Sequence, residues 1–135
     1  MTASEPVLKE LLASLAPRLN AGEFVFLSLK EPLPTHVRPL VSFHEWEGES
    51  VVLRVEQAET IGLKHSADTC AWITLGVQSP LDSVGLTAAV AAALAAEGIP
   101  CNVVAAFHHD HLFVPSSDGQ KALEILHRLQ RKTKE

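Results

Sequence analysis

Two short segments carry the residue types that could do chemistry. They are the turn from Ser79 to Thr87 and the strand end from His108 to His111. A glycine-containing turn that leads into a helix leaves backbone N–H groups without partners, and these groups can hold an anion with the help of the helix dipole. The second segment sets one carboxylate, Asp110, among imidazoles, and a carboxylate can hold an ammonium group. Together the two segments could grip opposite ends of a small zwitterion.

The turn predicts a helix that Asp82 or Ser83 caps and that runs to about Glu97. Gly85 would let a ligand approach the backbone closely. An ordinary helix cap, and a turn residue between two strands for Asp110, are the alternative interpretations. The candidate binding residues are Asp82, Ser83, Val84, Gly85, Leu86, Asn102, Val103 and Asp110.

Metal binding and catalysis are less well supported by the same residues. His109 and His111 would share one face of a strand, but nothing predicts a third ligand, so we expect no metal and no cofactor. His109 and Asp110 are neighbours and would point to opposite faces, which separates them as an acid–base pair. No nucleophile-elbow spacing is present. We therefore expect that the protein is not an enzyme.

The first half of the chain predicts a helix followed by strands. Apolar residues recur on one helical face from Val7 to Leu15, and Pro17 ends the pattern. The following segments predict a strand over 23–29, an irregular proline-containing connection over 30–39, a hairpin of 40–46 with 50–55, a short helix over 56–63 and a polar connection over 64–69.

The second half predicts the order strand, helix, strand, strand, helix. Its strands are expected at 71–77, 99–107 and 111–114, with 99–107 a central strand because it is apolar almost throughout. This order is a ferredoxin-like unit that lacks its last strand. We expect a strand of the first half, or a second subunit, to cover the open edge. The fold class is therefore α+β, with an antiparallel sheet and helices on one face.

Composition excludes several classes of partner. The chain has 135 residues, 47% of them hydrophobic, and a formal net charge of -5. Its basic residues gather only near the C-terminus, so we expect no nucleic-acid partner. The longest strongly apolar run, 84–96, is shorter than the roughly 20 residues of a membrane span. Because no secretory signal is visible and the two cysteines lack metal or redox spacing, we expect a cytoplasmic protein.

The segment from about residue 70 to 130 resembles the ACT domain. The resemblance rests on Val84-Gly85-Leu86, on Cys101-Asn102-Val103-Val104 and on His109-Asp110-His111, which fall in the family's order. It is similar to the branch in which a short protein carries two ACT-like units in tandem, the branch of the eukaryotic cytosolic arginine sensor. This similarity implies a degenerate ACT-like half over residues 1–65 and an ACT domain over 66–135, packed as one compact unit.

The resemblance also implies a function. ACT units are regulatory and bind an amino acid at an interface between units, and Asp110 occupies the position of the aspartate that takes the ligand amine. The expected protein is a small ligand sensor, a homodimer, that signals through assembly or through an unidentified protein target. The alternative is an interaction module that binds no small molecule.

Overall fold

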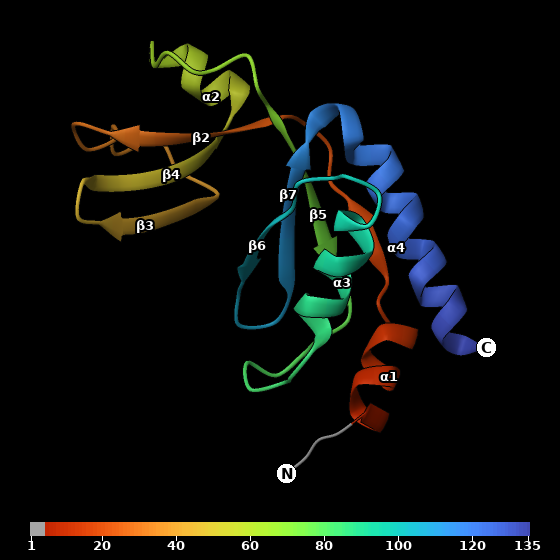
Figure 1. Cartoon of the computed structure of the whole chain (residues 1–135). Helices are drawn as coiled ribbons and strands as arrows, with labels where there is room; N and C mark the ends of the chain where they lie inside the picture. The colour runs from red at the N-terminus through yellow and green to blue at the C-terminus, as the bar shows by residue number, and fades with distance from the viewer. Residues whose placement is uncertain (1–4) are drawn as a thin grey trace.

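The computed structural model describes residues 5–135, and one antiparallel sheet runs through both halves of the chain (Figure 1). Its strands are β1 (Pro17–Leu19), β2 (Phe24–Leu29), β3 (Val41–Glu45), β4 (Gly48–Arg54), β5 (Cys70–Leu75), β6 (Asn102–Ala105) and β7 (Asp110–Pro115). The helices are α1 (Glu5–Ala13), α2 (Val55–Thr60), α3 (Leu86–Ala95) and α4 (Gly119–Lys134), with the 3₁₀ turn η1 (Ser116–Asp118) before α4.

The N-terminal half supplies the strand that the C-terminal unit lacks. The strand order is β3-β4-β2-β5-β7-β6, and β1 pairs with β5 from Pro17↔Leu75 to Leu19↔Ile73. β2 pairs with the other end of β5 at Phe24↔Cys70. The prediction that a strand of the first half covers the open edge of β5 is therefore confirmed.

All helices lie on one face of the sheet, as the predicted fold class requires. In Figure 1, α1, α3 and α4 lie together beside β5 and β7, and α2 lies above β2 and β4. Phe24 and Cys70 are directly opposite each other across the β2–β5 pair, so they point to the same face. Both belong to the cluster on the face without helices. The halves therefore share one helix-covered face and one bare face.

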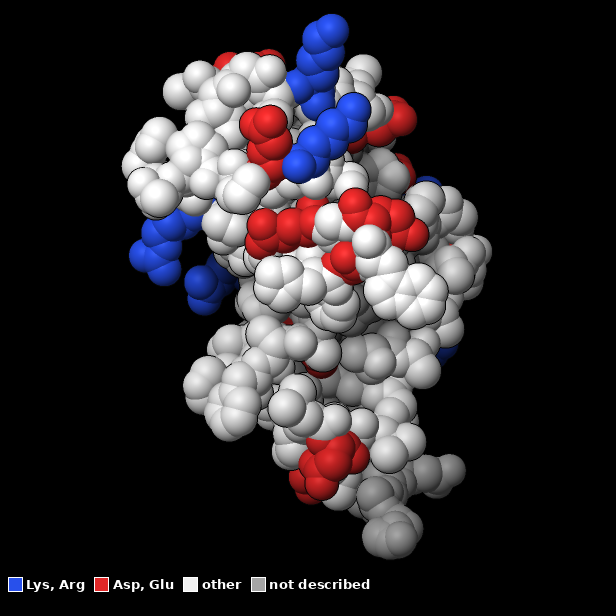
Figure 2. Space-filling view, turned by 90° about the vertical axis from the view of Figure 1, so that its left-hand side faces the viewer, with Lys and Arg blue, Asp and Glu red and all other residues white. Residues whose placement is uncertain are grey.

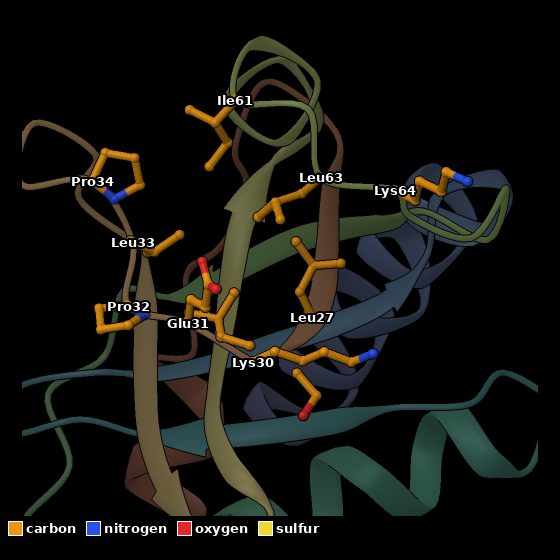
Figure 3. Close-up of a pocket in the computed structure, with 11 residues that line it drawn as sticks. Leu27, Lys30, Glu31, Pro32, Leu33, Pro34, Ile61, Leu63 and Lys64 are labelled. Carbon is orange, nitrogen blue, oxygen red and sulfur yellow. The ribbon is translucent and has the colours of Figure 1, made fainter.

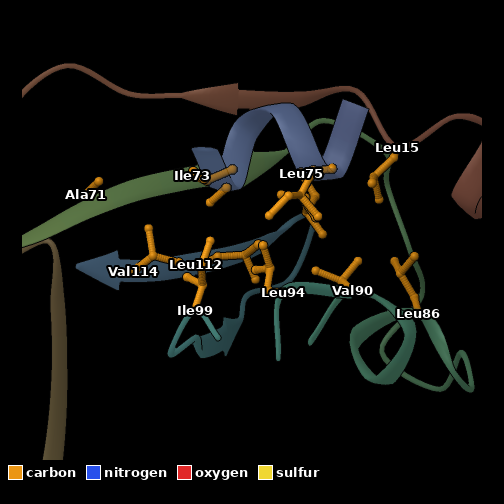
Figure 4. Packing of buried hydrophobic residues seen from close by; sticks show 13 residues of the cluster. Leu15, Ala71, Ile73, Leu75, Leu86, Val90, Leu94, Ile99, Leu112 and Val114 are labelled. Atoms are coloured by element: carbon orange, nitrogen blue, oxygen red, sulfur yellow. The ribbon is translucent and has the colours of Figure 1, made fainter. Parts of the chain in front are cut away.

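The main core lies between β5, β7 and the helices α3 and α4 (Figure 4). Period-two alternation turns Ile73 and Leu75 of β5 and Leu112 of β7 toward the helices, where all three are fully buried. Leu15, between α1 and β1, is buried in the same cluster. The N-terminal segment is thus part of the core of the C-terminal half.

Two smaller clusters hold the N-terminal half. One lies under α2 and contains Val25, Leu29, Val51, Leu53 and Ala58. The other lies on the bare face, where Phe24, Val52 and Phe113 are buried together although they come from different halves. The sheet curls so strongly that the Phe26 and Phe113 rings meet edge to face at 5.4 Å. This contact joins β2 to β7 across the bare face.

The structure corrects one strand assignment. The segment predicted as a central strand over 99–107 forms the short edge strand β6, and most of its residues are exposed. The central position belongs to β7, which pairs with both β5 and β6. Apolar content alone does not tell which strand of the β6–β7 hairpin lies beside β5. That depends on how far the connection through α3 carries the chain across the sheet before β6 begins.

Candidate functional site

The turn between β5 and α3 (residues 76–85) differs from the predicted helix cap. The helix begins only at Leu86, its N-cap is Gly85 in a left-handed conformation (φ 99°), and no side chain caps it. Asp82 and Ser83 are therefore not caps, which corrects the prediction. The reason is local: the Ser83 N–H donates to the Pro80 carbonyl at 3.0 Å, so both residues belong to a turn that precedes the helix.

The first turn of α3 offers backbone donors. Within residues 5–135, the N–H groups of Leu86, Thr87 and Ala88 have no hydrogen-bond acceptor, and the Ala89 N–H donates to the Gly85 carbonyl at 2.9 Å. The side chain of Leu8 in α1 packs closely against the Gly85 backbone. A Cβ built on Gly85 would lie 3.0 Å from Leu8 Cδ2. Helix α1 thus borders the start of α3.

Asp110 lies at the start of β7 on the helix-facing side, next to this turn. Among residues 7–135 it is the single charged side chain in the buried class, with 6% of its surface exposed. Its Oδ2 accepts a hydrogen bond from the Ser79 hydroxyl at 3.2 Å, and no cationic side chain of the described residues lies within 4 Å. A buried carboxylate held by one hydroxyl has unused capacity to accept hydrogen bonds.

A hollow of about 630 Å³ opens beside this carboxylate. It is lined by Gln78, Ser79, Pro80, Leu81, Asp82, Phe107 and His108. Neither Asp110 nor the first N–H groups of α3 line it, but Ser79 does, and Ser79 also bonds to Asp110. Ser79 therefore stands between the hollow and the buried carboxylate.

The remaining predicted site residues are not all brought together. Val84 is 78% exposed, and the Leu86 side chain is buried in the main core, so only its N–H faces the turn. Val103 lies on the edge strand β6 and pairs with Leu112. Asn102 pairs with Phe113, three residues from the Ala105↔Asp110 pair, which is about 10 Å along the strand. Asn102 lines a different hollow, with Cys70 and Phe113. The structure therefore does not bring Asn102 together with Asp110 within one chain.

Sequence reasoning located two residues of the site incompletely. Ser79 was noted as part of the turn but not as the partner of Asp110, and Phe107 was not connected to the site, whereas His108 was already included in the segment that carries Asp110. Ser79 comes directly before Pro80, and a serine ahead of a proline is a common start of a turn. That signal marks the turn, but it does not say which strand the hydroxyl will face.

A second polar cluster lies on the bare face of the sheet, around His111. Its Nδ1 accepts a hydrogen bond from Trp72 Nε1 at 3.0 Å and lies 3.1 Å from the Thr74 hydroxyl. Asn20 Nδ2 in turn donates to Thr74 Oγ1 at 2.9 Å. Because Trp72 can only donate, His111 Nδ1 is the acceptor and the imidazole is neutral. Burial lowers the pKa of His111, the neighbouring His109 lowers it further, and Asp110 opposes the shift.

This pKa predicts a pH dependence of stability. Well above pH 6.5, the ordinary pKa of histidine, both the folded and the unfolded state hold His111 neutral. As the pH falls below that value, the unfolded state takes up the proton first, so the free energy of unfolding decreases until the folded imidazole is protonated too. We expect His111→Asn, whose amide oxygen can still accept from Trp72, to lose this component. Urea unfolding of both proteins at several pH values from 7.5 to 5 measures this component. If the free energy of unfolding depends on pH equally in both proteins, the assignment to His111 is contradicted.

Metal-ligating side chains do not gather in the described part of the chain. Within residues 5–135 no group of three or more His, Cys, Asp or Glu side chains is arranged to hold a metal ion. Burial raises the pKa of the Cys70 and Cys101 thiols, and the Asp68 charge adds to the effect at Cys70. Both changes disfavour the thiolate, which is the form that binds metals.

Two ACT-domain families match the sequence, over residues 3–70 and 66–128. The chain belongs to the ACT-domain family. Membership of this family supports a regulatory role. None of the described helices is both long and apolar enough to span a membrane.

Solved structures with this fold include a protein of unknown function from Vibrio cholerae, described as a possible transport protein. It is 40% identical, with a TM-score of 0.81 over 92% of this chain and 96% of that one. A protein from Agrobacterium tumefaciens is 22% identical (TM-score 0.61; 86% and 89% covered). The ligand-free regulatory subunit of aspartate kinase from Thermus thermophilus is 9% identical (TM-score 0.60; 86% and 97% covered) and shows the fold alone. A comparison with curated proteins finds no significant match.

Proposed function

We propose that this chain is a regulatory protein that binds a free amino acid between the turn 76–85 and the start of β7. The observation that carries the proposal is Asp110, a buried carboxylate whose only hydrogen-bond donor among the described residues is the Ser79 hydroxyl. An ammonium group is the partner that such a carboxylate lacks. The N–H groups at the start of α3 would hold the ligand carboxylate.

The same residues explain how binding would produce a signal. Asp110 is almost completely covered, so a ligand reaches it only when the turn opens and Ser79 gives up its bond to the carboxylate. Asp82, Ser83, Val84 and Gly85 form the segment that would move. Movement there reaches α1, because Leu8 lies against Gly85. Ligand binding would then be coupled to the position of the N-terminal helix.

The experiment is a melting-temperature series with the twenty amino acids. An amino acid at 100 times its dissociation constant should add about 2.7 kcal/mol to the free energy of unfolding, which is several degrees for a chain of this size. Asp110→Asn should weaken binding roughly ten- to a hundredfold, because a charge-assisted hydrogen bond is lost. Asp68→Asn, an exposed carboxylate outside the turn and the hollow, is the matched comparison and should bind nearly as well as the original.

Two results would count against this function. One is a melting temperature that no amino acid changes. The other is a shift that persists in full in Asp110→Asn, which would place the ligand elsewhere on the molecule.

The proposal has further parts that concern the whole chain. Residues 1–65 and 66–135 act as two ACT-like halves of one unit, the protein works in the cytoplasm as a dimer, and it carries no catalytic activity of its own. Its support is family membership, together with the shared sheet and core. An unidentified protein target would receive the signal.

The second candidate is an interaction module without a ligand. The specific observation is helix α3, which has no charged residue and exposes Ala88, Ala92 and Ala95. Small residues let another helix approach closely. If this candidate holds, Ala92→Gln disturbs assembly while no amino acid changes the melting temperature of the original protein.

A further inference from the structure

A hollow of about 510 Å³ lies in the N-terminal half, away from the turn 76–85 (Figure 3). Its walls are the end of β2, the segment that follows β2 and the segment that follows α2. The apolar lining comes from Leu27, Leu29, Pro32, Leu33, Pro34, Ile61 and Leu63. The volume lies within the range of sites that hold a small molecule or one large side chain.

The hollow exists because no helix follows β2 in the way that α3 follows β5. In the C-terminal half, β5 leads into the ten-residue helix α3, which covers the sheet. In the N-terminal half, β2 leads into the irregular segment 30–40, which contains Pro32, Pro34 and Pro39. Only the six-residue helix α2 lies on this part of the sheet. The apolar side chains at the end of β2 are therefore incompletely covered.

Charged groups border the hollow on two sides. In Figure 3, Lys30 and Lys64 extend on the same side, beyond Leu27, while the Glu31 carboxylate lies across the hollow beside Leu33. Among the described residues, none of these three charged groups has an ion-pair partner within 4 Å. The site thus offers two cations at one rim and a hydrogen-bond acceptor opposite them.

The turn of the β3–β4 hairpin carries the complementary groups. Trp46 is fully exposed at its tip, and Phe43, three residues earlier on β3, is 68% exposed. The same hairpin carries three glutamates, Glu45, Glu47 and Glu49. The Glu45 carboxylate accepts a hydrogen bond from the Ser50 hydroxyl, and the Glu49 carboxylate accepts one from the Ser42 hydroxyl. Within residues 5–135, none of the three glutamates has a cationic partner. Figure 2, which views this end of the molecule, shows a band of acidic side chains with basic ones above it.

The hairpin tip and the hollow lie at the same end of the sheet. Leu29, the last residue of β2, pairs with Glu49, and a Cβ built on Gly48 would lie 2.9 Å from the Leu29 carbonyl oxygen. Figure 1 shows that β2 and β3 both end at the same end of the sheet. One surface therefore holds a protruding group and a cavity side by side, which is what a two-fold contact between identical chains requires.

We propose that Trp46 inserts into this hollow of a second copy of the chain, and that the second copy's Trp46 inserts reciprocally. The indole ring covers the apolar floor, and its N–H donates to Glu31 across the hollow. The acidic residues next to Trp46 meet Lys30 and Lys64 at the rim. The contact rests on the dimer of the proposed function and specifies how that dimer forms. It does not depend on amino-acid binding, so the melting-temperature series with amino acids can fail while the contact stands, and the contact can fail while an amino acid still binds.

The first test removes the inserted ring. Sedimentation velocity of the original protein over a range of concentrations should show a monomer–dimer equilibrium, and Trp46→Ala should raise the dissociation constant about 30-fold or more, as expected of a central aromatic anchor. Because Trp46 makes no buried contact within its own chain, Trp46→Ala should fold normally, which its melting temperature checks. Val7→Ala, another exposed apolar side chain, on helix α1, is the control and should dimerise as the original does.

The second test identifies the partner as a copy of the same chain. Lys30→Glu/Lys64→Glu makes the rim acidic, and Glu45→Lys/Glu47→Lys makes the hairpin basic. Each double variant alone opposes like charges and should be monomeric. In an equimolar mixture both contacts pair opposite charges, so a heterodimer should form. No association in the mixture would overturn the proposal.

A spectroscopic reading follows the same equilibrium. In a Trp72→Phe background Trp46 is the only tryptophan, and its emission should shift to shorter wavelength as the concentration rises. Three results overturn the proposal: an original protein that stays monomeric, a Trp46→Ala variant that dimerises as strongly as the original, or a dimer that Ala92→Gln, rather than Trp46→Ala, dissociates.

Discussion

Alanine in place of Phe113 lowers the free energy of unfolding by about 3–5 kcal/mol. Phe113 is 1% exposed and lies on the bare face of the sheet with Phe24 and Val52, which belong to the other half of the chain. Its ring also meets Phe26 at 5.4 Å. Truncation leaves a cavity at the place where the two halves join, and the surrounding strands cannot close it without changing the curl of the sheet. Urea unfolding measures the loss.

Phe107 provides the control for this prediction. It is the same residue type in the same hairpin, but it is 75% exposed, so Phe107→Ala should change the free energy of unfolding by less than about 0.5 kcal/mol. If Phe113→Ala costs no more than Phe107→Ala, the two halves are not held by the cluster on the bare face.

Alanine in place of Leu15 costs about 3–5 kcal/mol of unfolding free energy. Leu15 is fully buried in the main core although it lies some sixty residues before the strand it packs on. The backbone around it is also engaged: the Leu15 carbonyl accepts from the Val77 N–H at 3.1 Å, and the Ala16 carbonyl accepts from the Gly76 N–H at 2.9 Å. Loss of the side chain therefore weakens the attachment of both α1 and β1.

Leu81→Ala, at an exposed position, is the matched comparison for Leu15→Ala and should be nearly neutral in the same urea titration. A loss below about 1 kcal/mol for Leu15→Ala would mean that the N-terminal segment does not stabilise the C-terminal half. β1 would then pair with β5 without contributing to the stability of the C-terminal half.

Much of the fold could be predicted because it depends on local periodicity. The alternation in 71–75 and the helical spacing of Ala122, Ile125, Leu126 and Leu129 each indicate one buried face. The missing edge of the C-terminal unit was also predictable, since an unpaired strand at a sheet edge must be covered. Which strand covers it was left open, because the three-residue strand β1 carries almost no periodic signal.

The candidate site was predicted in part. Asp110 and the turn after β5 were recognised from their residue types, and the structure places them next to each other through Ser79. Asn102 lies apart from Asp110 in the structure, and sequence order does not reveal that β6 runs away from Asp110. The helix cap was displaced by two to three residues, from Asp82 or Ser83 to Gly85, because the Pro80 turn takes up Asp82 and Ser83 before the helix can begin.

The sequence by itself determined most of the elements, the α+β class and the family, because these depend on spacings within short segments and on motifs in a given order. Only the tertiary structure decided that Asp110 is buried without a cation, and that Trp46 stands fully exposed beside an apolar hollow. Burial and exposure depend on which distant segments cross, and such crossings are set by the curl of the whole sheet rather than by any one stretch of residues.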